Sequence, residues 1–596
     1  MASGPGVKIL CLPMDPHRPA SSGRPGWARW LAWAATVAAY SLATLIYLRP
    51  IWRVGGDCLA PSLDDPLFNL YVLKWGVHQL RLGLPDLWNA NLFYSTPGTF
   101  TLSDHLLGPA AQLALFLLVV PNAIAGYNFL LFTAFVGTAL AVCWVCRRMG
   151  LSWPAALLAG WMYTFSPFRL TQVAHLQLLI AQWAPLALWF WDRLLAERTA
   201  RNAALFLVFY LLHVTGGCYL AYMIHVPLLA IFLSRALAEG RGILSFRALR
   251  ILVPVALIAG IAVGALFLPY RNFSRSLGLV RTEREVREMG ATPVAYLSPA
   301  RESLYFSSGV RSSLRRAGFP GMTLYRPERV LFAGLLPTAL FLVGAAGRWR
   351  RRREEPWSPW ERGLALSGLL CFALTFSAVY VPLMRVVPGM NGMRVPARFY
   401  AFVSLTLVVF AGLGVDLLRG KLASPRGRAV LVALLGAGLL VELAPQPLRW
   451  RPLEREEEFP AVYRWIAAEP SVRALIELPI HSDTRENEHI YHSTLHWKPL
   501  ANGYSGYMPP EHERLVGTIH FVPEQDGLDL LREMGISHLV IHAETPRRMA
   551  VLRDWDARFA SGEERQVERV YQEEDIWVYR LLPPPTSSRN PKRAGL

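Results

Sequence analysis

Repeated apolar stretches, each about as long as the hydrocarbon core of a bilayer is thick, constrain this chain more than any other feature. Residues 28–48 and 123–146 are two of these stretches, and similar ones recur as far as residue 445. Hydrophobic residues make up 53% of the 596 residues, and charged residues only 17%. This pattern predicts a polytopic α-helical membrane protein and argues strongly against a soluble one.

About eleven segments qualify as spans by apolar length and by their charged, proline or glycine boundaries. They are residues 28–48, 123–146, 152–168, 173–195, 202–218, 219–235, 249–269, 327–347, 362–383, 397–417 and 427–445. A further apolar segment, residues 106–121, is short and flanked by prolines, which permits it to enter the membrane without crossing. If it does cross, the count becomes twelve.

The positive charge of the chain indicates its orientation. The formal net charge is +18, and much of it lies in short arginine-rich turns such as residues 348–353. Such turns hold topology and contact anionic lipid, so we expect membrane lipid and not nucleic acid as the partner. Arginine and lysine in the connections place the N-terminus in the cytoplasm and the C-terminus outside the cytoplasmic (inner) membrane. No cleavable signal peptide is apparent, so the first span is expected to remain as an anchor.

The chain divides into four parts along the sequence. Residues 1–27 form a cytoplasmic tail, and residues 28–445 form the transmembrane domain with extracytoplasmic loops 49–105 and 270–326. Residues 446–582 predict a small extracytoplasmic α/β domain, because helical patterns such as AVYRWIAAEP alternate with strand-like ones such as ALIELPI and SHLVIHA. The last residues, 583–596, have the composition of a disordered tail.

The six cysteines predict no disulfide framework, because they are scattered and most lie in or beside apolar spans. Cys143 and Cys146 have the spacing of a redox or metal motif, but they end a hydrophobic helix and no second ligand pair accompanies them. We therefore interpret them as packing residues.

Paired carboxylates near the start of the first loop are the most reactive feature of the sequence. Asp64-Asp65-Pro66-Leu67-Phe68 follows the first span closely, in a loop rich in tryptophan and tyrosine that is expected to lie against the bilayer. In one interpretation the carboxylates only cap a helix that begins at the proline. In the other, a partly desolvated carboxylate acts as a general base or positions a metal.

Several segments of the chain resemble the GT-C superfamily of integral-membrane glycosyltransferases, and more narrowly uncharacterised bacterial membrane proteins of the YfhO type. The segments are DDPLFNLYVLKW, LFYSTPGTFTLSDHLLGP, HLQLLIAQWAPL, RVPARFYAF and YHSTLHWKPLANGYSGYMPP. The family's first outer loop carries an Asp-Glu-x-x-aromatic pattern, which Asp64 to Phe68 match except that the second acid is aspartate. This departure leaves open whether Asp64 or Asp65 is the base; we favour Asp65 because Pro66 fixes the backbone beside it.

The resemblance implies transfer of a sugar from a polyprenyl-phosphate-linked donor to a cell-envelope acceptor outside the membrane. A leaving phosphate needs fixed positive partners, and Arg394 and Arg398 lie four residues apart, at the expected membrane surface. Anchoring at the membrane edge is the alternative for both. Asp104 and His105, which close the first loop, are further donor-side candidates.

Two polar residues within a predicted span are also donor-pocket candidates. His175 and Gln182 lie in FRLTQVAHLQLLIAQW, which is unusually polar for membrane depth. Hydrogen bonding between helices without a ligand is the alternative. A metal site that combines His175 with His213 and His225 is weakly supported, because their spacing fits no compact ligand motif.

A cluster of aromatic, amide and imidazole side chains in the outer domain suits contact with an acceptor. Its candidates are His492, Trp497, Asn502, Tyr504 and Tyr507. A structural loop would have a similar composition. His492 and His496 could share a helix face around zinc, but the glutamate of the metalloprotease pattern is missing.

Two other functions stay open at this stage. A lipid or glycan transporter (a flippase) would also be polytopic, although paired repeats with broken helices are not evident. A non-catalytic scaffold for envelope assembly could keep the outer domain without needing the aspartates. The sequence leaves the donor sugar, the acceptor, any divalent metal and the oligomeric state undetermined.

Overall fold

The computed structural model describes residues 26–298, 327–444, 447–480, 484–519, 524–543, 545–560 and 566–583, together with the single residues 312, 316 and 522. Most of the N-terminal tail, much of loop 270–326 and nearly all of the C-terminal tail therefore lie outside the described residues. Contacts divide the chain into two compact units. The first comprises Met1–Val54, Asn128–Leu266 and Val280–Leu448; the second comprises Gly55–Tyr127, Phe267–Leu279 and Arg449–Leu596.

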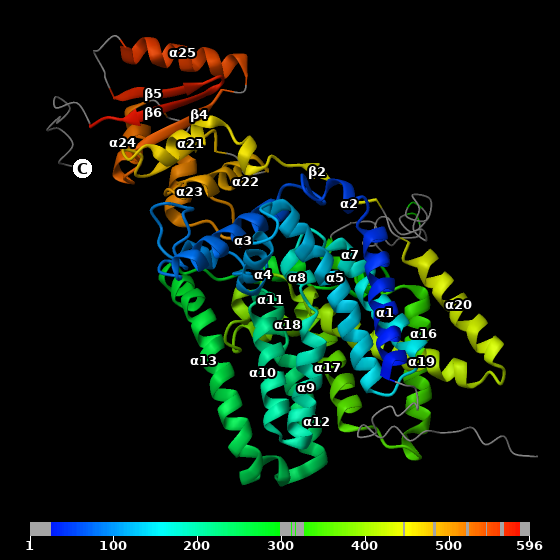
Figure 1. The fold of residues 1–596 in the computed structure, drawn as a ribbon. Helices are drawn as coiled ribbons and strands as arrows, with labels where there is room; N and C mark the ends of the chain where they lie inside the picture. Colours follow the sequence, from blue (N-terminus) through cyan, green and yellow to red (C-terminus); the bar gives the residue numbers. More distant parts are fainter. Residues whose placement is uncertain are drawn as a thin grey trace, which may run out of the picture. The chain divides into compact units, whose positions relative to one another are not determined.

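The first unit is a bundle of helices, several of which lie side by side (Figure 1). Its helices are α1 (Gly26–Tyr47), α2 (Ile51–Val54), α6 (Trp153–Thr164), α7 (Pro167–Thr171), α8 (Leu176–Leu179), α9 (Trp183–Glu197), α10 (Ala200–Val214), α11 (Cys218–Met223), α12 (His225–Glu239), α14 (Glu283–Met289), α16 (Leu335–Arg350), α17 (Pro359–Thr375), α18 (Ser377–Met384), α19 (Tyr400–Gly420) and α20 (Pro425–Glu442), with most of α5 (Ala123–Arg148) and α13 (Phe246–Ser276).

Each predicted span contains helix, but the helices are more broken than the apolar pattern indicated. Within the described residues, five helical segments are long and apolar enough to cross a membrane, which agrees with a multi-pass membrane protein. The expected continuous span 173–195 is wrong, because residues 180–182 separate α8 from α9. Segment 106–121 contains α4 (Leu107–Leu117), whose 11 residues are too few to cross a bilayer.

Some of the arginines expected at the lipid surface are instead buried and paired. Arg348 lies 2.6 Å from Glu361, and both side chains are almost fully buried. Arg235 approaches the fully buried Asp192 at 2.7 Å. Hence the arginine-rich turns contribute internal ion pairs between helices as well as surface charge.

Glycine allows α16 and α19 to cross at very short range. A Cβ atom added to Gly344 would lie 1.9 Å from the carbonyl oxygen of Phe410, and one added to Gly414 would lie 2.1 Å from that of Leu340. Backbone atoms cannot move aside as a flexible side chain can, so only glycine fits at this crossing.

We therefore expect Gly344→Ala to destabilise the protein by about 1–3 kcal/mol, because the two helices must separate. Gly436→Ala in α20 is the matched control, since a Cβ there meets no atom within 4 Å. The control should be neutral or more stable by up to about 1 kcal/mol, from helix propensity alone. Thermal unfolding of the detergent-solubilised protein measures the stability of both variants. Equal changes in stability for Gly344→Ala and Gly436→Ala would contradict the close crossing.

The second unit contains a four-stranded sheet in the order β3-β4-β6-β5, of which Figure 1 labels β4, β5 and β6. Its elements are β1 (Cys58–Leu59), α3 (Asp65–Leu82), α4, β2 (Arg451–Pro452), α21 (Ala461–Ala468), β3 (Leu475–Leu478), α22 (Thr484–His492), α23 (Pro510–Thr518), α24 (Gln525–Glu533), β4 (His538–His542), α25 (Pro546–Ala560), β5 (Val567–Glu573) and β6 (Ile576–Leu581). β3 and β4 are parallel, whereas β4–β6 and β5–β6 are antiparallel. The helices, strands and hairpin expected in this region are therefore confirmed.

The two faces of the sheet have different contents. On one face, Ile476, Leu539 and Trp577 share an apolar core with side chains of α23, α24 and α25. Because side chains alternate along a strand, Glu477 points to the opposite face. There it contacts Tyr463 of α21 and His489 of α22.

Candidate functional site

The acidic pair lies at the beginning of a helix. Asp65 is the first residue of α3 and Asp64 is its N-cap, with Pro66 in the first turn. The Asp64 side chain makes no capping hydrogen bond, so the geometry does not support capping as its role. Both residues are half-buried.

The acidic pair contacts the polar segment of the C-terminal region, more than four hundred residues later in the chain. The Tyr504 hydroxyl lies 3.5 Å from Asp65 Oδ1, at the outer limit of a hydrogen bond, and its ring packs against Phe68. The Asn487 amide donates to the Asp64 carbonyl oxygen at 3.2 Å. The structure thus brings together Asp65 and Tyr504, which were separate candidates in the sequence.

Backbone pairing holds these segments in place. Residues 499–501 bond to Leu475 of β3, and the same stretch pairs with the first loop through Leu500 N–H to Asn91 O (2.7 Å) and Tyr94 N–H to Leu500 O (3.0 Å). β1 also pairs with β2. The first loop is therefore part of the C-terminal fold, which fixes the acidic pair relative to Tyr504.

Other candidates from the sequence lie in the same unit with different surroundings. Trp497 stacks on His78, with 4.5 Å between ring centroids, and His105 is buried beside Tyr270. His492 lies 3.2 Å from the Tyr463 hydroxyl. Asp104 and Tyr507 are half-buried.

Asn502 is better placed to position backbone than to bind an acceptor. It is fully buried, and its amide accepts from Glu477 N–H at 2.8 Å and donates to Glu477 O at 2.9 Å. Its role is therefore to hold β3 beside the segment that carries Tyr504.

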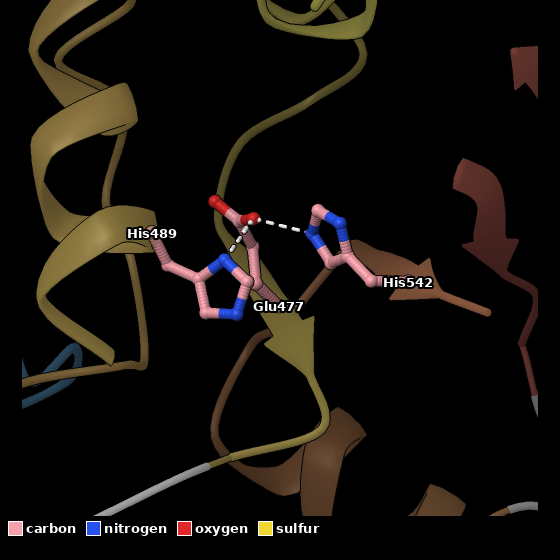
Figure 2. A group of neighbouring side chains, drawn as sticks. All are labelled: Glu477, His489 and His542. Carbon is pink, nitrogen blue, oxygen red and sulfur yellow. Dashed lines mark hydrogen bonds and ion pairs between the residues drawn. The ribbon is translucent and has the colours of Figure 1, made fainter. Parts of the chain in front are cut away.

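A second polar cluster surrounds Glu477 (Figure 2). His489 Nδ1 lies 3.0 Å and His542 Nε2 lies 2.8 Å from Glu477 Oε2. The Tyr463 hydroxyl donates to the same oxygen at 2.8 Å. Glu477, His489 and His542 could hold a metal ion, and they form the one such group within the described parts of the chain.

The members of this cluster shift one another's pKa values. Burial disfavours the Glu477 carboxylate, but the charge and hydrogen bonds of His489 and His542 outweigh it and hold its pKa well below the usual range. Burial also opposes a charged His489, yet Glu477 raises the pKa of that imidazole. For His542 burial dominates and lowers the pKa, so its imidazole is neutral near pH 7.

Sequence reasoning missed this cluster. It considered His492 with His496, and His175 with His213 and His225, but the structure assembles His489 and His542 around a glutamate. The usable signal was a charged or imidazole side chain inside two apolar strands, ALIELPI and SHLVIHA. Polar groups at buried strand positions require partners.

His496, which is half-buried, and His538, which is buried, predict a pH effect on stability. Burial lowers the pKa of His496 and of His538 to about 4. Below the unfolded value of about 6.5, only the unfolded chain takes up these protons, so the free energy of unfolding falls as pH decreases toward 4.

His496→Asn should therefore reduce the acid sensitivity, because Asn can still accept the hydrogen bond that His496 Nδ1 takes from Lys498 N–H. Between pH 7 and pH 5 the parent should lose about 2 kcal/mol more than the variant. Chemical denaturation followed by tryptophan fluorescence measures this difference. Equal losses would show that His496 titrates normally in the folded protein.

In the first unit, the polar segment around His175 is divided among α7, α8 and α9. Arg169 is buried and donates to the Leu179 carbonyl at 2.9 Å. Gln182 is buried beside Gly137 of α5, and its Oε1 has no hydrogen-bond partner in the described structure. His175 is half-buried.

Arg394 and Arg398 both approach Tyr219 of α11. The Arg394 backbone N–H donates to the Tyr219 hydroxyl at 3.1 Å, and the Arg398 guanidinium lies 4.5 Å from the ring centroid. Arg398 is buried and lies 3.7 Å from Glu328. Arg394 is half-buried, and the Nε atoms of both arginines make no hydrogen bond to described residues.

The remaining candidates of this unit have local roles. His213 Nε2 lies 3.1 Å from the Leu220 carbonyl, and His225 Nε2 lies 2.9 Å from the Tyr210 hydroxyl. No metal-binding group that includes either histidine occurs among the residues described. Cys143 and Cys146 are buried free cysteines.

Comparison with known proteins gives a likeness in fold. No family model and no curated protein matches the chain. Among solved structures, the apo oligosaccharyltransferase of Archaeoglobus fulgidus aligns with 95% of this chain and 76% of its own, with a TM-score of 0.50 and 13% identity. The two chains share a fold.

A second solved structure is more distant: apo ArnT of Cupriavidus metallidurans aligns with 93% of this chain and 98% of its own, at a TM-score of 0.33 and 11% identity. At this level of identity the likeness to the oligosaccharyltransferase is one of fold alone. Nothing in the comparisons bears on the YfhO-type resemblance.

Proposed function

We propose that this chain is a membrane glycosyltransferase that moves a sugar from a polyprenyl-phosphate-linked donor to a cell-envelope acceptor on the outer side of the cytoplasmic membrane. The observation that carries the proposal is the contact between Asp65 and Tyr504 at the start of α3. Asp65 is a half-buried carboxylate in the first turn of α3, and such a group beside an aromatic hydroxyl suits removal of a proton from an acceptor hydroxyl.

Asp65 is the better candidate for the base. Its carboxylate faces Tyr504, whereas Asp64 is the N-cap and its carbonyl takes the Asn487 hydrogen bond. Tyr504 and Trp497 offer rings on which a sugar can stack, and Tyr507 lies further along the same segment. In this proposal Asn502 and His492 position that segment.

On the donor side, Arg394 and Arg398 bind the phosphate through guanidinium N–H groups that the fold leaves unused. His175 and Gln182 contact the polar part of the donor. Asp104 and His105, which close the first loop in the sequence, are further donor-side residues. The acidic pair could also hold a divalent metal that orients the phosphate.

The purified full-length chain in nanodiscs, mixed with membranes from a deletion strain, tests this proposal. A panel of radiolabelled polyprenyl-phosphate sugars serves as donor. We expect protein-dependent movement of label from lipid into an envelope glycan. Label that crosses the bilayer while still attached to lipid would instead indicate a transporter, and no effect on any donor would leave the scaffold function.

The proposal requires the acidic loop and the C-terminal region to lie outside the cytoplasm. Fusions of a periplasm-active phosphatase near residues 300 and 500 should be active, and fusions near residues 240 and 352 inactive. A cytoplasm-active reporter at the same positions gives the reverse pattern. A phosphatase fusion at 500 that is inactive although expressed would contradict the proposed topology.

A further inference from the structure

We propose that Glu477, His489 and His542 bind one divalent transition-metal ion of the zinc class. This inference does not depend on the proposed function. The three residues come from β3, α22 and the end of β4, so the metal would join three separate elements of the second unit (Figure 2). Their ligand atoms all lie within 4.8 Å of one another.

The donor set selects the metal. Two imidazole nitrogens and one carboxylate oxygen are the ligands that Zn²⁺ accepts, with bonds of about 2.0–2.2 Å. Mg²⁺ and Ca²⁺ prefer all-oxygen sites. Three ligands at such distances from one ion lie about 3–3.5 Å apart, close to the 2.8 and 3.0 Å between Glu477 Oε2 and the two imidazole nitrogens.

Glu477 itself has an unused oxygen. Its side chain is fully buried, and the three donors that reach it all contact Oε2. Oε1 has no hydrogen-bond partner in the described structure. An unpartnered carboxylate oxygen in the interior is costly, and a cation beside the carboxylate compensates that cost.

Neighbouring groups hold the carboxylate in position. The Tyr463 hydroxyl donates to Oε2 at 2.8 Å, and Asn502 bonds to the Glu477 backbone on both sides. Metal ligands are characteristically oriented by such outer hydrogen bonds.

The ion would stabilise the helix that supports the acidic pair. α22 carries His489, and it also carries Asn487, which donates to the Asp64 carbonyl, and Glu486, which accepts from Gly503 N–H at 3.0 Å. Metal at His489 would therefore fix both segments that meet at Asp65 and Tyr504. Its role is structural, apart from the proton transfer.

The test uses full-length protein purified without a polyhistidine tag, stripped with chelator and titrated in parallel with zinc, manganese or magnesium chloride. Elemental analysis should find about one zinc per chain, and zinc should raise Tm by about 5 °C or more. X-ray absorption should show two imidazole nitrogens at about 2.0–2.1 Å. Glu477→Gln and His542→Asn should lose the zinc.

Two matched control variants should still bind zinc. His512→Gln removes another buried histidine of the same unit, and Asp65→Asn excludes a metal held by the acidic pair. Should the ligand variants fail to fold, the wild-type titration still decides. Four results would each overturn the proposal: no zinc uptake, uptake without imidazole ligands, uptake of magnesium or manganese alone, or full zinc retention in His542→Asn. The cluster would then be a buried ion pair between Glu477 and its histidine neighbours.

Discussion

Asp65→Asn should lower the rate of sugar transfer by about a hundredfold or more while donor binding stays unchanged. Asparagine keeps the shape of the side chain and can still accept the Tyr504 hydrogen bond. It cannot take a proton from the acceptor. The nanodisc assay measures transfer, and retention of labelled donor on the protein measures binding.

Asp86→Asn is the matched control, since Asp86 lies in the same unit, is exposed, and its carboxylate accepts from the nearby Asn89. It should transfer at the parental rate. Asp64→Asn should have a smaller effect than Asp65→Asn, and the reverse order would move the base to Asp64. Parental rates in both variants would exclude the acidic pair as the base.

Arg394→Gln should weaken use of the polyprenyl-phosphate donor by about tenfold or more, as expected for loss of one charged hydrogen bond to phosphate. Arg394 is the cleaner target of the two arginines, because it is half-buried and its Nε is unused. Arg398→Gln would also leave Glu328 without its partner, so its effect on stability would confuse the result.

Arg385→Gln provides the control. Arg385 is 65% exposed and pairs with Glu283 at the surface, where a salt bridge contributes little. Rates measured against donor concentration should show a raised KM for Arg394→Gln alone. Identical donor dependence in Arg394→Gln and the parent would reduce Arg394 to an anchor at the membrane edge.

The sequence predicted the helices and strands better than the contacts between distant segments. Apolar length located helices in every predicted span, and alternation located the strands around Glu477 and the β5–β6 hairpin. These patterns are local, so they can be recognised in the sequence without knowledge of the fold. The breaks between α8 and α9 were missed because the interrupting residues, 180–182, include apolar side chains that continue the hydropathy pattern.

Long-range pairing explains the other misses. The contact of Asp65 with Tyr504 depends on backbone bonds between residues 91–94 and 499–502, which no local pattern specifies. The approach of Arg398 to Glu328 likewise joins two segments that are separate in the sequence. The Glu477 cluster was overlooked because its three ligands come from separate elements, and no short spacing connects them.

Mass spectrometry of cell-envelope glycans tests the central claim most directly. The deletion strain is compared with its parent and with strains that carry the wild-type chain, Asp65→Asn or Asp86→Asn at equal membrane levels. The account predicts that one sugar is missing after deletion, restored by the wild type and Asp86→Asn, and still missing with Asp65→Asn. Unchanged glycans after deletion, or full restoration by Asp65→Asn, would contradict it.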